Sequence, residues 1–438
     1  MPLTQVAVLD DLRRLPPAGD AALAFAAASL AAGDGGGGWF KWDAASREAD
    51  DGGCVVAVES RSVGRWLRVY SGAADVRWFG ARGDGVADDT AAIQRAIDHH
   101  ADVHFPAGVY RLTRPIDVRE SWGRRLSGAG QTANPGAPGG FDNGRLSLAS
   151  TLLLDADDAP VLRLAGSGNL VERLCLMSKT RQPRDAANSY GIELNAFSRS
   201  RLSDLRIFNC ATGIGLPQRA VKRGKNSNWM FDSALSNIDI NNFSRCGLDL
   251  RNYQGGGTGN VLSQIYMANF ASGEQPNPEV YETDHFIRGH NWWEYVLQGV
   301  HCEWARCRGA ALELHNCNAA ISGLHMEGVR FAGEVDSVVR LEGGATGLTL
   351  DGAQLYQCRL EGGPASAPLA LVSTHSARSR ATVRNLYLSR TTTSLGGRKF
   401  TPARIQGGDA RIEVSGMMIE PSSVYVAPAP AAGLTLRE

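Results

Sequence analysis

Nine stretches of seven residues in this chain align with one another without a gap, and consecutive stretches begin 24 to 35 residues apart. A spacing in this range is typical of solenoids, in which each repeat forms one coil that stacks on the next. This repeat constrains the fold more than any other feature, because it decides which side chains lie in register. The stretches are VERLCLM from Val171, LSDLRIF from Leu202, LSNIDIN from Leu235, LSQIYMA from Leu262, LQGVHCE from Leu297, ISGLHME from Ile321, LDGAQLY from Leu350, VRNLYLS from Val383 and VSGMMIE from Val414.

Apolar residues occupy the first, fourth and sixth positions of each stretch. The fourth and sixth positions are two residues apart, so in a β-strand they share one face, which we predict to point inward. The fifth and seventh positions should then point outward. A helix would instead repeat its apolar residues every three or four positions.

A second apolar segment follows several of the turns, so we expect at least two parallel strands per coil and favour three. These segments are GIGL from Gly213, GLDL from Gly247, ALEL from Ala311, VVRL from Val338 and LALV from Leu369. Asparagines also recur at one position just after the first strand, namely Asn209, Asn242 and Asn269. We predict that their side chains hydrogen-bond to one another along the coil axis at a bend.

The composition excludes several classes of protein. The 438 residues include 45 basic and 45 acidic side chains, so the chain lacks the basic surface that nucleic-acid binding requires. No apolar run is long enough to span a membrane, and the alanine-rich segment 21–32 follows acidic residues rather than the basic leader of a signal peptide. The eight cysteines form no CxxC pair and no zinc-type cluster, so we expect buried free thiols, no metal and no cofactor.

Residues 1–75 differ from the repeats and predict a small β-rich module. Two aromatic segments, GDGGGGWFKWD from Gly33 and GRWLRVY from Gly64, are typical of strands. The tail, residues 421–438, contains APAPAAG and is predicted to be a linker or frayed end.

The segment between that module and the repeats predicts a capping helix at about residues 89–99. Asp88 or Asp89 can cap its N-terminus, and Ile93 and Ile97 lie one turn apart on one face. Such a helix would cover the open end of the solenoid core, which otherwise exposes strand edges. Two short strands, 103–105 and 109–112, should follow it.

This segment, FGARGDGVADDTAAIQRAID followed by FPAGVYRL, resembles the start of the pectate-lyase-like superfamily of right-handed parallel β-helices. The upstream aromatic segments resemble the short N-terminal module of phage and prophage tailspike proteins. The resemblance implies an all-β fold, a right-handed, single-stranded parallel β-helix over residues 76–420. It also implies a homotrimer, attachment to a tail or baseplate through the N-terminal module, and a location on the virion tail or outside the cell.

The same resemblance implies action on a bacterial surface glycan, such as a capsule, an exopolysaccharide or an O-antigen. The superfamily includes polysaccharide lyases, glycoside hydrolases, uronan epimerases and capsule-degrading tailspikes. The chain has neither the DPHE motif of alginate epimerases nor the NTD motif and partners of polygalacturonases. The calcium-binding aspartate ladder of classical pectate lyases is not visible either, so no catalytic residue can be transferred from the family.

The outward positions of the middle coils carry most of the titratable side chains. The fifth position reads Cys175, Arg206, Asp239, Tyr266, His301, His325, Gln354, Tyr387 and Met418, and the seventh reads Met177, Phe208, Asn241, Ala268, Glu303, Glu327, Tyr356, Ser389 and Glu420. We predict that His301 stacks on His325 and Glu303 on Glu327, each pair about 4.8 Å apart. Asp239 lies two coils before His301, so about 10 Å away along the axis.

Hydrolysis of a glycosidic bond needs one protonated and one ionised carboxyl group, roughly 5 Å apart in retaining enzymes and roughly 6.5–9.5 Å apart in inverting ones. Glu303 and Glu327 fit the first distance, and Asp239 with either glutamate approaches the second. Two glutamates this close cannot both ionise easily, so one should keep its proton. A lyase would instead need a base and cations near a uronate, for which His301, His325, Tyr266, Tyr356 and Arg206 are candidates.

We therefore favour an endo-glycosidase, with a polysaccharide lyase and a non-catalytic glycan-binding or structural tail protein as the alternatives. Stacked histidines and glutamates also occur as solvated ion-pair ladders. A site between subunits is a further alternative, with carboxylates from the acidic insertion, namely Glu274, Glu279, Glu282 and Asp284.

Three tryptophans in insertions, Trp229, Trp292 and Trp293, are candidates for stacking on sugar rings or for packing their loops onto the coils. A basic loop with Lys222, Arg223 and Lys225 either holds an acidic glycan or is simply solvated.

Overall fold

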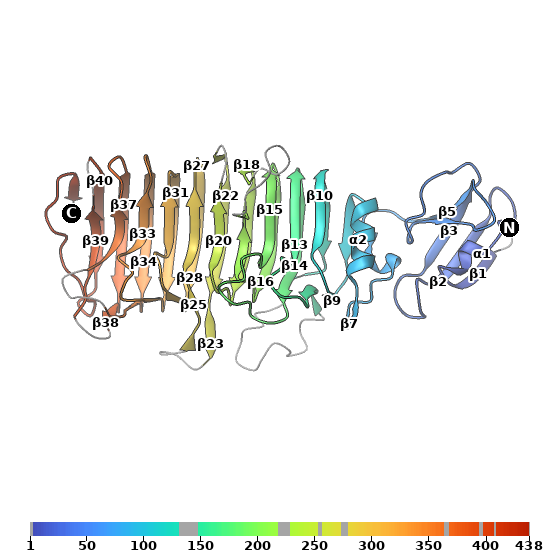
Figure 1. The fold of residues 1–438 in the computed structure, drawn as a ribbon, viewed down its shortest axis with the longest axis horizontal. Coiled ribbons are helices and arrows are strands. Elements are labelled where there is room, and N and C mark those ends of the chain that lie inside the picture. The colour runs from blue at the N-terminus through green and yellow to red at the C-terminus, as the bar shows by residue number, and fades with distance from the viewer. Residues whose placement is uncertain are drawn as a thin grey trace.

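Backbone hydrogen bonds between successive coils build an elongated rod, with the chain termini near its two ends (Figure 1). The computed structural model describes residues 3–130, 148–217, 228–252, 256–272, 279–362, 368–393, 397–406 and 409–437. A small N-terminal module occupies one end of the rod, helix α2 follows it, and the coils fill the rest (Figure 1).

The N-terminal module is a five-stranded sheet of order β1-β2-β3-β5-β4, as the aromatic segments predict. Its core contains Phe40 and Trp66, and the rings of Trp42 and Trp66 meet edge to face at 5.4 Å. The elements are β1 (Leu3–Val8), α1 (Asp11–Arg14), β2 (Leu23–Ala28), β3 (Gly38–Asp43), β4 (Val55–Ala57) and β5 (Arg65–Arg68).

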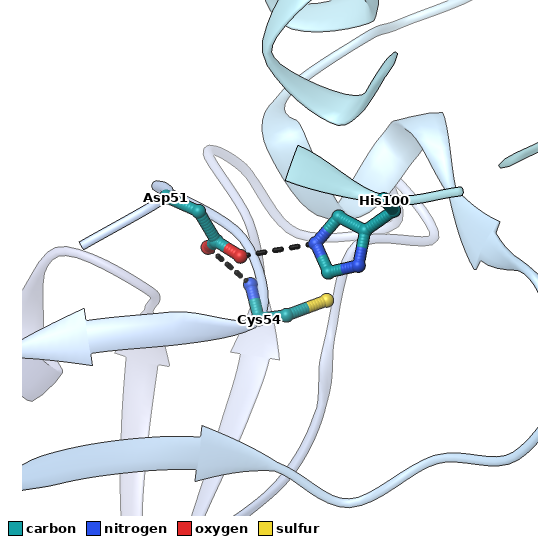
Figure 2. Close-up of side chains that lie close together, drawn as sticks. All are labelled: Asp51, Cys54 and His100. Atoms are coloured by element: carbon teal, nitrogen blue, oxygen red, sulfur yellow. Dashed lines mark hydrogen bonds and ion pairs between the residues drawn. The ribbon is translucent and has the colours of Figure 1, made fainter. Parts of the chain in front are cut away.

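Side chains from the module contact His100, the residue that follows helix α2 (Figure 2). Nε2 of His100 lies 3.0 Å from Oδ2 of Asp51, and Oδ1 of Asp51 accepts a hydrogen bond from the backbone N–H of Cys54 at 2.7 Å. The hydroxyl of Tyr70 lies 3.4 Å from Nδ1 of the same histidine. These contacts tie the module to the capped end of the rod.

Helix α2 (Thr90–His99) covers the N-terminal end of the coils, close to the predicted residues 89–99. Ile93 and Ile97 are buried in the main core, as predicted. Of the two candidate caps, Asp88 accepts the N–H of Thr90, whereas Asp89 accepts the N–H groups of the preceding loop. A 3₁₀ turn, η1 (Val76–Phe79), precedes the helix.

The nine aligned stretches all lie in one sheet of sixteen strands, which we call the long sheet. Its strands are β6 (Ala74–Asp75), β7 (Asp84–Asp88), β8 (Asp102–Phe105), β9 (Gly108–Leu112), β11 (Arg125–Gly128), β12 (Ser150–Leu154), β14 (Leu170–Ser178), β16 (Arg201–Phe208), β19 (Ala234–Asn241), β22 (Val261–Ala268), β28 (Tyr295–Glu303), β31 (Asn318–Glu327), β34 (Gly347–Tyr356), β37 (Arg380–Ser389), β40 (Arg411–Ile419) and β41 (Leu434–Arg437).

The second segments of the coils form a parallel sheet of eleven strands, which we call the second sheet. Its strands are β10 (Ile116–Trp122), β13 (Leu162–Ser167), β15 (Tyr190–Ser198), β17 (Thr212–Gly215), β18 (Met230–Phe231), β20 (Cys246–Arg251), β26 (His285–His290), β30 (Leu312–His315), β33 (Ser337–Glu342), β36 (Leu369–Thr374) and β39 (Phe400–Ile405).

A third sheet, which we call the short sheet, is confined to the later coils and has five strands of two residues each. These are β25 (Glu282–Thr283), β29 (Arg306–Cys307), β32 (Arg330–Phe331), β35 (Arg359–Leu360) and β38 (Thr392–Thr393). Two small pairs lie apart from the three sheets, β21 (Gly257–Thr258) with β27 (Trp292–Trp293) and β23 (Phe270–Ser272) with β24 (Glu279–Val280). The parallel β-helix predicted from the sequence is confirmed, with a third strand in the coils that contribute to the short sheet.

The predicted register holds through all nine aligned stretches. Position one of each stretch pairs with position one of the next, from Val171 with Leu202 to Val383 with Val414. The first-position side chains are buried, as are those of the fourth and sixth positions except Met417 and Ile419 in the last stretch. The inward face is therefore the one that the apolar pattern predicts.

The third position of every stretch adopts a left-handed backbone conformation, with φ between 51° and 71°. The residues are Arg173, Asp204, Asn237, Gln264, Gly299, Gly323, Gly352, Asn385 and Gly416. In an uninterrupted strand, positions one and four would face opposite sides. The left-handed residue bends the strand, and this bend allows both positions to face the core. Glycine and asparagine tolerate such a φ best, which accounts for six of the nine residues.

Three outward positions of the first coils point away from the core, as predicted, but their side chains are buried. Cys175, Met177 and Phe208 form a separate apolar cluster with Leu153 on the outer side of the long sheet. The reason is that β12 pairs with β14 and places Leu153 beside Met177, so apolar groups cover one another there.

The asparagine column is confirmed in part. Nδ2 of Asn242 donates to Oδ1 of Asn209 at 3.4 Å, and Nδ2 of Asn209 donates to the carbonyl of Ser178. Asn269 is fully buried in the same column, but its side-chain amide has no hydrogen-bond partner among the described residues.

The chain beyond residue 420 is not simply a linker, because β41 pairs with β40 and extends the long sheet. The predicted boundaries at residues 75 and 420 otherwise stay predictions. All eight cysteines are buried thiols outside any disulfide, as expected. Within the described residues, no helix has the length and apolar character needed to cross a membrane.

The left-handed bend can be tested at Gly323, where φ is 69° and an added Cβ would meet no atom closer than 3.7 Å. Because the space is adequate, a substitution reports on backbone strain alone. We expect stability to decrease in the order Gly, Asn, Ala, Val at position 323, with Gly323→Ala losing about 1 kcal/mol in the free energy of unfolding. Chemical denaturation measures this. Ser322→Ala, at the preceding exposed position, is the control, and an alanine variant as stable as the wild type would contradict the bend.

Candidate active site

Five polar side chains gather on the outer face of the long sheet, on the neighbouring strands β22, β28 and β31. Tyr266 pairs in register with His301, and His301 with His325. Glu303 and Glu327 form the second column, beside the first. The two imidazole rings lie 5.2 Å apart, as one strand spacing requires. The structure therefore brings together the five residues that the column pattern groups in the middle coils.

The two glutamates form a close acid pair. One carboxylate oxygen of Glu303, one of Glu327 and a ring nitrogen of His325 all lie within 4.8 Å of one another. The hydroxyl of Tyr266 donates a hydrogen bond of 2.9 Å to Oε2 of Glu303. Nδ1 of His301 lies 3.7 Å from Oε1 of Glu303, and Nε2 of His325 lies 3.4 Å from Oε2 of Glu327.

The environment treats the two carboxyl groups differently. The side chain of Glu303 is 15% exposed and that of Glu327 is 29% exposed. Burial raises the pKa of Glu303, the hydrogen bond from Tyr266 lowers it, and the charge of Glu327 raises it, with a net increase above the ordinary value. Burial and the negative charge of Glu303 also raise the pKa of Tyr266, so its hydroxyl remains a donor. Glu303 is therefore suited to hold a proton.

Glu303, His325 and Glu327 are also a set of donors that a divalent cation accepts, two carboxylates and one imidazole. The sequence predicts no metal here. The hydrogen bond from Tyr266 occupies one oxygen of Glu303, which suits a carboxyl group that takes part in proton transfer. Removal of metal therefore belongs among the controls for any activity of this site.

Asp239 and Arg206 lie on the same face but engage each other. Nη2 of Arg206 is 3.0 Å from Oδ2 of Asp239. Burial raises the pKa of Asp239, and Arg206 opposes this increase. Strand β22 lies between Asp239 and the acid pair. The ion pair makes Asp239 less suitable than Glu327 as a partner for Glu303, and Arg206 less available to a substrate.

Tyr356 extends the site toward the C-terminal coils. It is the register partner of Glu327 on β34. Its hydroxyl accepts hydrogen bonds from Nη1 of Arg390 at 3.2 Å and from Nε2 of Gln357 at 3.3 Å. The half-buried ring of Tyr356 therefore stands beside the acid pair, and its hydroxyl is held by two neighbours.

The tryptophans do not join this site. Trp292 is fully buried, stacks on Tyr295 at 4.3 Å and donates its indole N–H to the carbonyl of Leu250, so the prediction that it contacts sugar is wrong. Trp292 lies in β27, and its large apolar ring is part of the main core. Trp293 is 51% exposed but precedes β28, whereas Glu303 ends that strand, so the length of the strand separates them. Trp229 is half-buried and packs against Phe231 at 5.0 Å.

The alternative of a site between subunits, with acids from the insertion after β22, stays a prediction, although two of these acids are ion-paired within the chain. Glu282 pairs with Arg306 and Arg308, and Asp284 pairs with Arg184. Glu279 is exposed on β24. The remaining insertion residues of interest, Glu274, Lys222, Arg223 and Lys225, lie outside the described residues.

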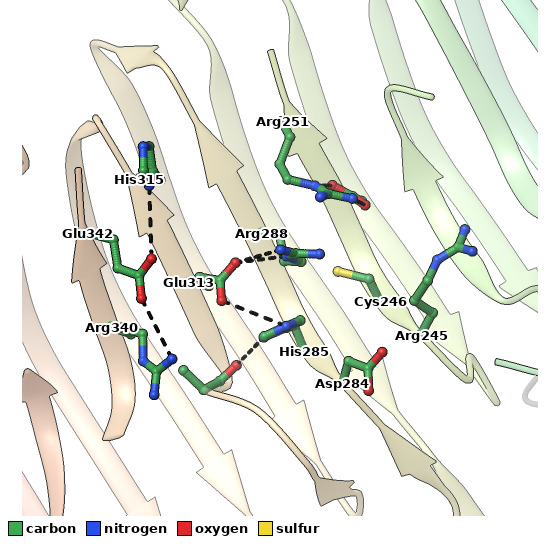
Figure 3. Close-up of polar contacts among 12 residues, drawn as sticks. Arg245, Cys246, Arg251, Asp284, His285, Arg288, Glu313, His315, Arg340 and Glu342 are labelled. Carbon is green, nitrogen blue, oxygen red and sulfur yellow. Dashed lines mark hydrogen bonds and ion pairs between the residues drawn. The ribbon is translucent and has the colours of Figure 1, made fainter. Parts of the chain in front are cut away.

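A second charged cluster, on the outer face of the second sheet, was missed by sequence reasoning (Figure 3). Nη2 of Arg288 lies 2.7 Å from Oε1 of Glu313, and Nη1 of Arg340 lies 3.6 Å from Oε1 of Glu342. The signal was present, because the segments ALEL and VVRL place a charged residue between two apolar ones.

The carboxylates of this second cluster are held by arginines. Burial raises the pKa of Glu313, but the positive charges of His285 and Arg288 lower it by more, so the net pKa falls below the ordinary value. Asp249, which is almost fully buried, pairs with Arg251 in the same way. An ionised, paired carboxylate cannot serve as a proton donor, so Glu313 fits a glycosidase less well than Glu303 does.

Two protein families match different parts of the chain. Residues 5–71 match the phage tail protein small four-stranded beta-sheet domain, and residues 73–269 match the family described as rhamnogalacturonase A/epimerase, pectate lyase-like. A segment of 44 residues is 59% identical to part of the mannuronan C5-epimerase AlgE1 of Azotobacter vinelandii. The matched segment covers 9% of this chain and 3% of that protein.

Solved tailspike structures share the fold. The full-length tailspike protein 2 of Escherichia coli O157:H7 bacteriophage CAB120 superimposes with a TM-score of 0.61 at 14% identity, over 94% of this chain and 51% of that one. The tailspike of Acinetobacter phage vB_ApiP_P1 gives 0.63 at 13% identity, over 97% and 74%. The tailspike gp49 of Acinetobacter baumannii bacteriophage Fri1, a capsular polysaccharide depolymerase, gives 0.52 at 15% identity, over 96% and 75%.

This chain thus spans about half the length of the first of these tailspikes. At such low identity the structural matches establish the fold alone. They agree with the resemblance found in the sequence: residues 73–269 match a pectate-lyase-like family, residues 5–71 match a phage tail domain, and the fold is a parallel β-helix like that of the tailspikes.

The geometry of the acid pair predicts opposite effects of two substitutions on the pKa of Glu303. Tyr266→Phe removes the hydrogen bond that stabilises the carboxylate, so the pKa should rise. Glu327→Gln removes a neighbouring negative charge, so the pKa should fall. A pH titration of the glutamate side-chain carbons by ¹³C NMR measures both. Shifts of the same sign in the two variants would show that the contacts differ from those described.

Proposed function

We propose that this protein is an endo-glycosidase that cleaves a bacterial surface polysaccharide, such as a capsule, an exopolysaccharide or an O-antigen. The observation that supports this most is the acid pair, in which Glu303 has a raised pKa and lies within 4.8 Å of an oxygen of Glu327. The shared fold with tailspikes, one of them a capsular polysaccharide depolymerase, supports the choice of substrate.

In this proposal Glu303 is the proton donor and Glu327 the nucleophile. Glu303 gives its proton to the oxygen of the leaving sugar while a carboxylate oxygen of Glu327 bonds to the anomeric carbon, and the glycosidic bond breaks. Glu303, now ionised, takes a proton from water, whose oxygen displaces Glu327 and restores both side chains. The short distance between the two carboxyl groups favours this double displacement over inversion, which needs room for a water molecule between them.

The neighbouring side chains have supporting roles in this proposal. Tyr266 orients Glu303 through its hydrogen bond, and His325 contacts Glu327 from the same strand. His301, whose side chain is 48% exposed, lies at the open side of the pair, where it can contact sugar hydroxyls. Tyr356 offers a ring on which a neighbouring sugar can stack.

A polysaccharide lyase is the second candidate, because two imidazoles stand beside the carboxylates and could act as bases on a uronate. A non-catalytic glycan-binding tail protein is the third. Incubation with capsular and lipopolysaccharide preparations separates them. New reducing ends without unsaturated-uronate absorbance support the hydrolase, the absorbance supports the lyase, and binding without cleavage supports the adhesin.

We further propose that residues 1–75 attach the protein to a phage tail or baseplate, that it acts as a homotrimer, and that it works on the virion tail or outside the cell. The match of residues 5–71 to a phage tail domain supports the attachment. The tailspike fold supports the location.

Glu303→Gln and Glu327→Gln should each reduce cleavage at least about 10²-fold and leave the fold intact, because each removes one of two chemically distinct roles. Release of reducing ends from the cleaved polysaccharide and circular dichroism measure the two properties. Glu342→Gln, a glutamate on the second sheet with only long ion-pair contacts, is the matched control and should keep its activity. Full activity in either site variant would remove the acid pair from the mechanism.

The short separation of the carboxyl groups also predicts that the new reducing end has the anomeric configuration of the bond that was cut. Proton NMR of the first products, recorded before mutarotation, detects this. Inversion would indicate a more distant pair, with Asp239 as one member. Loss of activity on chelation, with recovery on adding a divalent cation, would instead assign Glu303, His325 and Glu327 to metal binding.

A further inference from the structure

A cavity of about 230 Å³ lies at the corner between the long sheet and the short sheet. Trp304, Gly328, Gln357 and Arg390 contribute to it from the corner, and Arg330 and Arg359 contribute from the short sheet. The four corner residues directly follow the last residues of β28, β31, β34 and β37. Two of these four strands, β28 and β31, also carry the acid pair.

The cavity adjoins the acid pair closely. Trp304 and Gly328 are the residues that follow Glu303 and Glu327 in the chain. Gln357 and Arg390 both donate hydrogen bonds to the hydroxyl of Tyr356. A polysaccharide bound across the acid pair can therefore place a neighbouring sugar unit in the cavity.

The charged side chains that line the cavity in the described part of the chain are all positive. They are the guanidinium groups of Arg330, Arg359 and Arg390. Arg330 and Arg359 are register partners on β32 and β35, so their backbones lie about one strand spacing, roughly 4.8 Å, apart. Two guanidinium groups this close raise the local positive potential, which attracts an anion.

The preceding arginine in this column of the short sheet, Arg306, has its charge neutralised by glutamates. Arg306 on β29 is the register partner of Arg330 and pairs with both Glu282 and Glu361. Arg359 has no such ion pair within the described residues. The column thus runs from Arg306, which two glutamates neutralise, to Arg359, for which the described residues provide no ion-pair partner.

An apolar wall completes the cavity. The indole of Trp304 lies over Gly328, so closely that a Cβ on that glycine would stand 2.3 Å from the ring atom Cε3. Gly328 also has a φ of 62°, which glycine tolerates best. A tryptophan ring beside several guanidiniums suits a ligand with both an apolar face and a carboxylate, and sugar acids have both.

We propose that this cavity binds the carboxylate of a sugar acid, so that the substrate is an acidic polysaccharide with a uronic-acid residue close to the bond that is cut. The inference rests on the proposed function for its connection to cleavage, but the binding itself does not need the acid pair. Arg359 and Arg390 hold the carboxylate, and Trp304 packs against the sugar ring.

Binding of three small probes tests the proposal directly, namely D-glucuronate, D-glucose and inorganic phosphate, each titrated into the full chain and followed by NMR. We expect glucuronate to bind measurably where glucose does not, with an affinity that falls as salt is added. Arg359→Gln should weaken glucuronate binding at least tenfold. Arg306→Gln is the matched control, because its charge is already neutralised, and it should leave the affinity unchanged.

The opposite results would overturn the proposal. These are equal binding of glucose and glucuronate, or unchanged glucuronate affinity in Arg359→Gln. Phosphate binding as tight as glucuronate binding would indicate a general anion site and would overturn the assignment to a sugar. Gly328→Ala provides an independent variant, since the added methyl group displaces Trp304 and should weaken glucuronate but not phosphate binding.

Failure of the proposed function is distinguishable from failure of this inference. Glu303→Gln should abolish cleavage yet bind glucuronate at least as tightly as the wild type, because it removes no cation from the cavity. If that variant still cleaves polysaccharide while glucuronate binding depends on Arg359, the acid pair is wrong and the cavity assignment stands. If that variant loses cleavage but glucuronate does not bind the protein, the acid pair stands and the cavity assignment is wrong.

Discussion

The backbone hydrogen bonds between coils are the interaction on which the rest of the structure depends. They hold each strand about 4.8 Å from the next, and in parallel register they repeat that spacing along a column of equivalent side chains. The stacking of Glu303 on Glu327 and of His301 on His325 follows from this constraint, as does the placement of Arg330 beside Arg359. Chemistry on such a scaffold comes in pairs one strand spacing apart, and the identity of each pair decides whether it attracts, repels or shares a proton.

A second constraint is the left-handed residue at the third position of all nine aligned strands. Without it, positions one and four could not both face the core. Similar backbone angles recur at the corner after the long sheet, at Trp304, Gly328, Gln357 and Arg390. These corner residues line the cationic cavity together with Arg330, Arg359 and Thr392. A feature needed to close the coil therefore also places side chains beside the acid pair.

The two charged faces of the rod show why register alone does not define an active site. On the second sheet, acids and arginines such as Glu313 and Arg288 occupy neighbouring strands and neutralise one another. On the long sheet, burial and the charge of Glu327 raise the pKa of Glu303 by more than Tyr266 and the two imidazoles lower it, so that the net pKa stays above the ordinary value. Both faces are equally regular, but of the two clusters described it is the one on the long sheet that leaves a carboxyl group suited to donating a proton.

Much of the fold could be predicted from the sequence, because a solenoid repeats its pattern. The apolar positions defined the inward face, the alignment defined the register, and the segment near Ile93 and Ile97 defined the capping helix. The left-handed bend could have been predicted from the glycines and asparagines at the third position. The apolar cluster of Cys175, Met177 and Phe208 could not, because it depends on the pairing of β12, which lies outside the repeat.

What the sequence determined by itself was which residues share a column, and therefore that Glu303 lies beside Glu327 and Tyr266 beside His301. The tertiary structure decided which of these side chains interact, because contacts across columns depend on rotamers and on burial. It paired Arg206 with Asp239, placed Trp292 in the core and directed Tyr266 toward Glu303. It also formed the arginine cavity from two sheets that meet at a corner, a relation between segments that no pattern within one strand contains.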